Sequence, residues 1–123
     1  MLPLAAFGAS SNTAAPVLSL EENGTISIAY SGSDYTFHIS ELQQLTMEES
    51  LPSGFRTSGT ATAQYARGEF TLEELGTAKL YVFKNTAPYI SMKLENHYVI
   101  YNEQDPAATR ALFEKLSQLY VSH

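Results

Sequence analysis

Apolar and polar residues alternate with a period of two along most of the chain. The first clear run of this kind centres on Ile26 and Ile28, and a second, centred on Phe37, follows within a few residues. Because successive side chains of a strand point to opposite faces, each run predicts a half-buried strand. Residues 31–34 between them are turn formers, so the two strands are expected to pair as an antiparallel hairpin.

The second half of the chain repeats the alternation in four runs. Their apolar positions are Phe70 and Leu72; Ala78, Leu80 and Val82; Ile90, Met92 and Leu94; and Tyr98 and Ile100. Turn formers separate these runs at 75–76, 85–88 and 95–96. Such short connections favour antiparallel pairing, because parallel strands need a crossover of about a dozen residues or more.

Two further stretches lie between these halves. Leu42, Leu45 and Met47 are apolar at mixed spacing, which predicts a bulged strand, with a short helical turn as the alternative. Residues 53–63 are mostly Ser, Thr, Gly and Ala, which is typical of a polar connection between strands. In total we expect about seven strands.

The last segment changes to a helical period. Asp105 followed by Pro106 predicts a helix start, because the carboxylate accepts exposed backbone N–H groups and the fixed φ of proline suits the first helical position. Leu112, Leu116 and Leu119 then recur at helical spacing. We therefore expect one amphipathic helix, whose apolar stripe packs on the open end or one face of a curved sheet.

The first 16 residues do not show the alternation that predicts strands. Residues 1–9 are apolar, and residues 10–16 are small and mostly polar and end in proline, which is typical of a linker. We therefore divide the 123 residues into a flexible N-terminal tail or linker, residues 1–20, and one domain, residues 21–123. A second interpretation of residues 1–9 is the end of a hydrophobic anchor that belongs to a longer protein.

The charge balance excludes some partners. Seven basic and thirteen acidic side chains give a formal net charge of −6. Binding of nucleic acid is therefore not expected, because it needs clustered Lys and Arg, and attraction to anionic lipid is weakened. No run approaches the roughly 20 apolar residues of a membrane-spanning helix, so we expect no membrane insertion by this chain. The absence of cysteine removes thiol catalysis and cysteine-ligated metal sites.

Five short segments carry a family resemblance. They are LPSGFRTSGT at 51–60, GEF at 68–70, KLYVF at 79–83, PYI at 88–90 and NEQDP at 102–106. Taken together, they resemble a bacterial pleckstrin-homology-like domain family, and the resemblance covers residues 24–121.

This resemblance has consequences for fold and setting. It implies a mainly β fold, a bent antiparallel sandwich or partly open barrel of about seven strands that one C-terminal helix caps. Members of the family often follow membrane-spanning segments, so the resemblance implies the soluble part of a membrane-associated bacterial protein. It implies no particular chemistry.

The motifs that could carry catalysis are incomplete. Gly54 and Gly59 have the spacing of a phosphate-binding loop, but Thr60 stands where the loop needs lysine. His38 and Glu41 lack an obvious third ligand, so we expect no metal and no cofactor. The glutamate pairs 48–49 and 73–74 are assigned to solvated strand ends, because neighbouring strand residues point to opposite faces. We therefore expect no enzyme, and a small hydrolase is the least favoured alternative.

Two groups of residues are the candidate binding positions. Arg56 and Arg67 bracket a polar stretch, so residues 53–67 could bind a small anion, a peptide terminus or a lipid headgroup. The polar residues predicted to contribute there are Thr57, Ser58 and Thr60. The second group is aromatic and consists of Tyr81, Tyr89 and Tyr98.

Eight tyrosines without a tryptophan are a high number for this length. Cross-strand aromatic pairing is one explanation, and an exposed amphipathic face for a protein partner or for self-association is the other. The leading hypothesis is a non-catalytic interaction module that binds a protein or peptide, and anion or lipid headgroup binding at residues 53–67 is the alternative.

Overall fold

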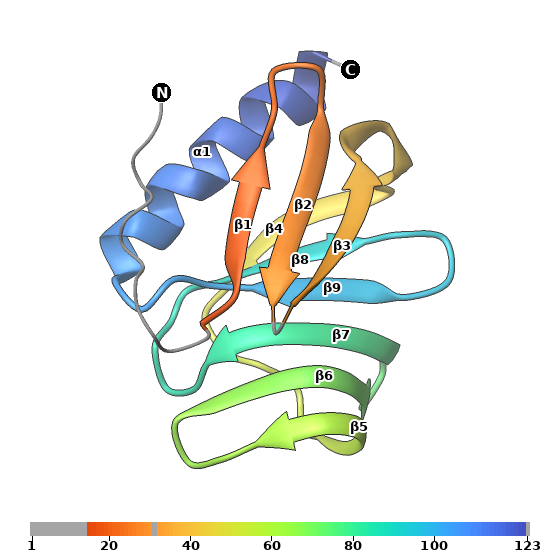
Figure 1. Ribbon diagram of the computed structural model, residues 1–123, viewed down its shortest axis with the longest axis vertical. Coiled ribbons are helices and arrows are strands. Elements are labelled where there is room, and N and C mark those ends of the chain that lie inside the picture. The colour runs from red at the N-terminus through yellow and green to blue at the C-terminus, as the bar shows by residue number, and fades with distance from the viewer. Residues whose placement is uncertain (1–14, 31, 123) are drawn as a thin grey trace. The chain divides into compact units, whose positions relative to one another are not determined.

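The computed structural model describes residues 15–30 and 32–122. The chain divides between His38 and Ile39 into two compact units. Within the described residues, the first unit holds a three-stranded sheet, and the second holds a six-stranded sheet and one C-terminal helix (Figure 1). These elements agree with the predicted mainly β, pleckstrin-homology-like fold, with nine strands in place of about seven.

The first unit is an antiparallel sheet in the order β1-β2-β3. Its strands are β1 (Val17–Leu20), β2 (Thr25–Tyr30) and β3 (Ser33–His38). Ile26 lies opposite Phe37 and Ile28 opposite Tyr35, and Ile26, Ile28 and Phe37 are buried. The predicted hairpin is confirmed. Strand β1 lies in residues that the sequence assigned to the tail, and the boundary of the domain at residue 20 stays a prediction.

The second unit is a sheet in the order β4-β8-β9-β7-β6-β5. Its elements are η2 (Ile39–Glu41), β4 (Gln44–Glu48), β5 (Gly54–Ala61), β6 (Tyr65–Leu72), β7 (Gly76–Phe83), β8 (Tyr89–Lys93) and β9 (Tyr98–Tyr101). The strand predicted from Leu42, Leu45 and Met47 is present as β4, and the short helical turn η2 ends before these three residues.

One pair of strands departs from the expected antiparallel pattern. Strand β9 pairs with β8 antiparallel on one side and with β7 parallel on the other. The connection from β7 to β9 is residues 84–97, which include β8 itself. Strand β8 and its flanking loops therefore form a crossover of the length that a parallel pair requires. The sequence prediction was wrong here because it judged each short turn separately.

The prediction of a polar connection at residues 53–63 is also wrong. Residues Gly54–Ala61 form β5, which pairs with β6 along its whole length, with a bulge between Arg56 and Ser58. Gly59 lies opposite Gly68, and both have positive φ, 105° and 121°. A Cβ added at Gly68 would lie 2.6 Å from the Cα of Gly59. The glycines are therefore used for a close approach of two strands, and not for a loop.

The connection between β4 and β5 shapes the six-stranded sheet. These two strands lie at opposite edges of the sheet, yet only residues 49–53 join them. Six chain steps reach about 20–22 Å at full extension. Five interstrand spacings of about 4.8 Å would separate the edges of a flat sheet by about 24 Å. The sheet must therefore curl, and residues 49–53, which we call the strap, cross its concave face.

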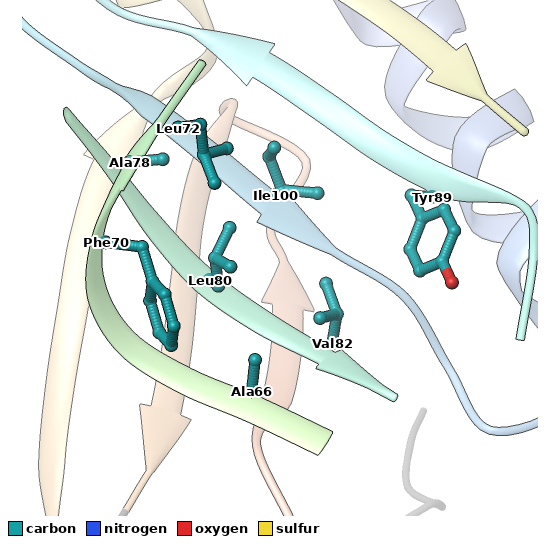
Figure 2. Packing of buried hydrophobic residues seen from close by; sticks show 8 residues of the cluster. All are labelled: Ala66, Phe70, Leu72, Ala78, Leu80, Val82, Tyr89 and Ile100. Carbon is teal, nitrogen blue, oxygen red and sulfur yellow. The ribbon is translucent and has the colours of Figure 1, made fainter. Parts of the chain in front are cut away.

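The concave face carries an apolar cluster. Its buried members are Ala66, Phe70, Leu72, Ala78, Leu80, Val82, Tyr89 and Ile100 (Figure 2). They come from β6, β7, β8 and β9, and Leu51 of the strap packs against them. The strap is thus fastened to this face by apolar contact, and the backbone N–H of Glu73 also donates a hydrogen bond to the carbonyl of Ser53 at 2.7 Å.

The helix α1 (Pro106–Ser122) begins where the sequence predicts it. The backbone N–H of Ala107 donates to Oδ1 of Asp105 at 3.0 Å, so Asp105 caps the helix. Leu116 is fully buried, and the helix contacts η2, β4 and β8. The predicted amphipathic helix on one face of the sheet is confirmed, and its partner is the convex face at the β4 edge.

Asn102 ties the sheet to the start of the helix. Its side-chain oxygen accepts from the N–H of Phe83 at 2.7 Å, and its amide nitrogen donates to the carbonyls of Phe83 at 3.1 Å and Thr86 at 2.8 Å. The side chain is almost fully buried, at 1% exposure. Asn102 therefore satisfies three backbone groups at the end of β7 in a site that water does not reach.

Replacing Leu116 with alanine tests the packing of the helix. Leu116→Ala is expected to lower the free energy of unfolding by about 2–5 kcal/mol, because it leaves a cavity in a fully buried position. Urea denaturation followed by circular dichroism measures this change. Val121 is 84% exposed, so Val121→Ala should change the same free energy by less than about 0.5 kcal/mol. Equal effects of the two substitutions would contradict the packing.

Asn102→Ala tests the polar link. We expect it to lower the free energy of unfolding by about 2–4 kcal/mol, because buried backbone groups of Phe83 and Thr86 lose their partners. The matched control is Asn96→Ala in the exposed β8–β9 turn, which should have little effect. Amide hydrogen exchange provides a second measurement, since protection should fall at Phe83 and not across the whole sheet.

Candidate functional site

The concave face of the six-stranded sheet contains two neighbouring hollows. The first has a volume of about 620 Å³ and lies over β6 and β7. Its floor is apolar and consists of Ala66, Phe70, Leu72 and Leu80. Polar side chains stand at its border, among them Glu49, Lys84 and Asn85. The strap and Ala87 complete the lining.

The second hollow has a volume of about 400 Å³ and lies over β4, β8 and β9. Its lining is more polar than that of the first. The polar and charged members are Gln44, Thr46, Glu48, Ser50, Glu74, Ser91 and the hydroxyl-bearing Tyr89 and Tyr98, and the apolar members are Leu51, Pro52, Leu75 and Ile100.

The two hollows share one wall. Ser50, Leu51, Pro52 and Tyr89 line both. Tyr89 is buried, and its hydroxyl oxygen accepts a hydrogen bond from the backbone N–H of Thr86 at 3.2 Å. That bond holds the ring at the side of the cluster (Figure 2). The two hollows therefore adjoin at the strap and Tyr89.

The glutamate pairs contribute to this face in a way that the sequence did not predict. Glu48 is the last residue of β4, and Glu74 lies in the turn between β6 and β7, yet both line the second hollow. Neither neighbour, Glu49 or Glu73, does so. Glu49 lines the first hollow, so the pair 48–49 is divided between the two hollows of one face and not between two faces of a strand. Glu73 and Glu74 lie in the turn between β6 and β7, where the alternation of a strand does not apply.

The structure separates the predicted binding residues into two places. Tyr89 lines both hollows, and Tyr98 lines the second. Ser58 and Thr60 are exposed on β5, the outermost strand of the sheet. Arg56 and Thr57 also belong to β5, but their side chains lie outside the described part of the structure.

Arg67 and Tyr81 lie on the convex face, opposite each other on β6 and β7. Arg67 is 6% exposed, and its guanidinium carbon lies 3.7 Å from the centre of the Tyr65 ring and 5.4 Å from that of Phe83. This arrangement is a cation–π contact inside the protein. Burial, with a smaller contribution from the charge of Glu69, raises the pKa of Tyr81 above its ordinary value.

Two kinds of feature are absent from the described residues. Within residues 15–30 and 32–122, no three His, Asp or Glu side chains gather in an arrangement that could hold a metal ion. In the same ranges, no helix has both the length and the apolar character that crossing a membrane demands.

Comparison with known proteins identifies the family. The sequence model of the family described as bacterial PH domain matches residues 18–116. The chain belongs to this family. No curated protein and no solved structure matches the chain. PH domains commonly mediate protein or lipid interaction, and membership indicates an interaction module. Which residues of this PH domain bind a partner stays a prediction.

A small charged group also lies on the convex face of this PH domain. Nζ of Lys79 lies 3.9 Å from Oε2 of Glu69. Burial lowers the pKa of His97, the charge of Lys79 lowers it further, and that of Glu69 opposes both. Neutral His97 is therefore favoured in the folded state. Its contribution to stability is present above the unfolded pKa of about 6.5 and is lost as the pH falls through the lower folded pKa.

Lys79→Gln tests this electrostatic effect. The pKa of His97 is expected to rise toward its ordinary value, because a positive charge beside the imidazole is removed. An NMR titration of the histidine Cε1–H signals measures the pKa directly. Lys115→Gln removes the same charge from an exposed position on α1 and serves as the control. An unchanged or lower pKa of His97 in Lys79→Gln would contradict the assignment.

Proposed function

We propose that this chain is a non-catalytic module that binds an extended segment of a partner protein on the concave face of its six-stranded sheet. The first hollow receives an apolar side chain of that segment. The observation that carries this proposal is the first hollow itself, an open space of about 620 Å³ with an apolar floor and a polar border.

The dimensions and chemistry of the hollow support a binding role. Ligand sites are typically concave, about 300–1,000 Å³ in volume and mostly apolar, with a few polar groups that orient the ligand. The floor of Phe70, Leu72 and Leu80 provides apolar surface, and Lys84 and Asn85 provide polar groups at its edge. An apolar side chain placed there leaves water, which contributes about 25 cal/mol per Å² buried.

The position of the strap supports an extended ligand. The two hollows adjoin at the shared wall of Ser50, Leu51, Pro52 and Tyr89. A peptide in extended conformation can cross such a wall and place side chains on either side of it. A second copy of this chain could supply the peptide, which is the case of self-association.

The alternative of anion or lipid headgroup binding at residues 53–67 has less support. Arg67 is buried against Tyr65 and Phe83, so its guanidinium is engaged with aromatic rings. The net charge of −6 opposes an anionic surface. Attachment to a membrane through a longer protein is compatible with peptide binding and stays a prediction.

Ala87→Leu tests the proposed site. Ala87 is partly buried and lines the first hollow, so a larger side chain there takes up the space that the ligand would use. The probes are peptides selected from a display library against the full chain, and fluorescence polarisation measures their affinity. We expect Ala87→Leu to weaken binding about tenfold, which corresponds to about 1.4 kcal/mol.

The control for this experiment is Ala111→Leu, which makes the same change at an exposed position of α1. Circular dichroism and thermal unfolding establish that both variants are folded. If selected peptides bind Ala87→Leu and Ala111→Leu with equal affinity, the first hollow is not the binding site.

A further inference from the structure

We propose that the second hollow binds a basic side chain, lysine or arginine, of the same peptide that places an apolar side chain in the first hollow. This inference rests on the proposed function, and it specifies the chemistry of the partner as a segment that combines one apolar and one basic residue.

The charges around the second hollow favour a cation. Glu48 and Glu74 both line it, and no Lys, Arg or His among the described residues does. The carboxylate of Glu48 is held in place, because Oγ1 of Thr46 donates a hydrogen bond to its Oε2 at 2.8 Å. Glu74 has a positive φ of 72° in a tight turn beside Leu75. Two acidic residues from distant parts of the sequence thus line one space.

Ser91 provides an independent observation. It is 7% exposed and lines the second hollow, and it lies between Thr46 and Ile100 in the register of the sheet. Its hydroxyl makes no hydrogen bond with the described residues. The hydroxyl oxygen is not among the fully buried polar atoms that lack a partner, so it is accessible from the hollow. An ammonium or guanidinium N–H that entered the hollow could donate a hydrogen bond to the Ser91 oxygen.

The apolar part of the lining suits a long basic side chain. Leu75 and Ile100 contribute aliphatic surface, and Tyr98 contributes an aromatic ring. Lysine and arginine pack their methylene groups on apolar surface while the charged end contacts polar groups. The second hollow therefore offers a surface for the stem and carboxylates for the charge.

The charge of the whole chain points to the same partner chemistry. A net charge of −6 attracts basic segments and accelerates their association, an effect that salt reduces. The first hollow differs in this respect, because its lining includes both Glu49 and Lys84. Only the second hollow has a lining of one sign, which assigns the basic residue to it and the apolar residue to the first.

Synthetic peptides with blocked ends test the inference on the full chain. Each has a serine and threonine background with one leucine and one lysine, and a series varies the number of residues between them. In companion peptides, arginine or the uncharged norleucine replaces lysine. At low salt, we expect at least one spacing at which the lysine and arginine peptides bind about fivefold to tenfold more tightly than the norleucine peptide.

Two variants locate the effect. In Glu48→Gln combined with Glu74→Gln, the preference for lysine over norleucine is expected to disappear, while affinity for the norleucine peptide is kept. Glu73→Gln combined with Glu95→Gln removes the same charge from exposed positions outside the lining and should keep the preference. Ser91→Ala should reduce the preference about threefold, because the ligand N–H loses an acceptor.

The outcomes separate this inference from the proposed function. If Ala87→Leu weakens binding but lysine and norleucine peptides bind equally, the first hollow is the site and the basic specificity is overturned. If both double glutamate variants lose the preference equally, the effect is general electrostatics, and the second hollow is likewise overturned. If Ala87→Leu has no effect on any peptide, the proposed function itself fails.

Discussion

The strap is the constraint on which the second unit depends. Only residues 49–53 join the two outermost strands of a six-stranded sheet, and so short a segment cannot bridge the edges of a flat sheet. The sheet curls toward the strap, and the curl creates the concave face. Leu51 packs on the apolar cluster and, with Ser50, Pro52 and Tyr89, lines both hollows of that face. The candidate site is thus a direct result of one short connection.

Two local features support the curled sheet: the facing glycines of β5 and β6, and the buried side chain of Asn102. Gly59 and Gly68 face each other across β5 and β6, where any side chain would collide with the opposite backbone. At the other end of the concave face, Asn102 satisfies the backbone of Phe83 and Thr86, so the chain can turn away from the sheet without leaving buried groups unpaired. The polar and glycine-rich composition of residues 53–63 is therefore a property of a bent edge strand.

The local elements could be predicted from the sequence, and the long-range pairings could not. Alternation around Ile26 and Ile28 and the cap at Asp105 depend on neighbouring residues, and both predictions are confirmed. The parallel pairing of β7 with β9 depends on the order of the strands across the sheet, where β8 and β9 both lie between β4 and β7. No local sequence pattern encodes that order. Residue type alone pointed to Tyr89 and Tyr98, which do line the hollows. That Glu48 and Glu74 line the same hollow depends on the arrangement of the whole sheet, which no local pattern reveals.

The two faces of the sheet differ in how their charged side chains are paired. On the convex face, Arg67 contacts the rings of Tyr65 and Phe83, and Lys79 lies near Glu69, so positive charges there are matched by groups of the protein itself. On the concave face, Glu48 and Glu74 border a space that no basic side chain of the described residues lines. A net charge of −6 attracts cations to the whole surface, but the second hollow is where acidic side chains line a space without a basic one. In the proposed interaction, the distribution of charge, and not the total charge, distinguishes a basic partner.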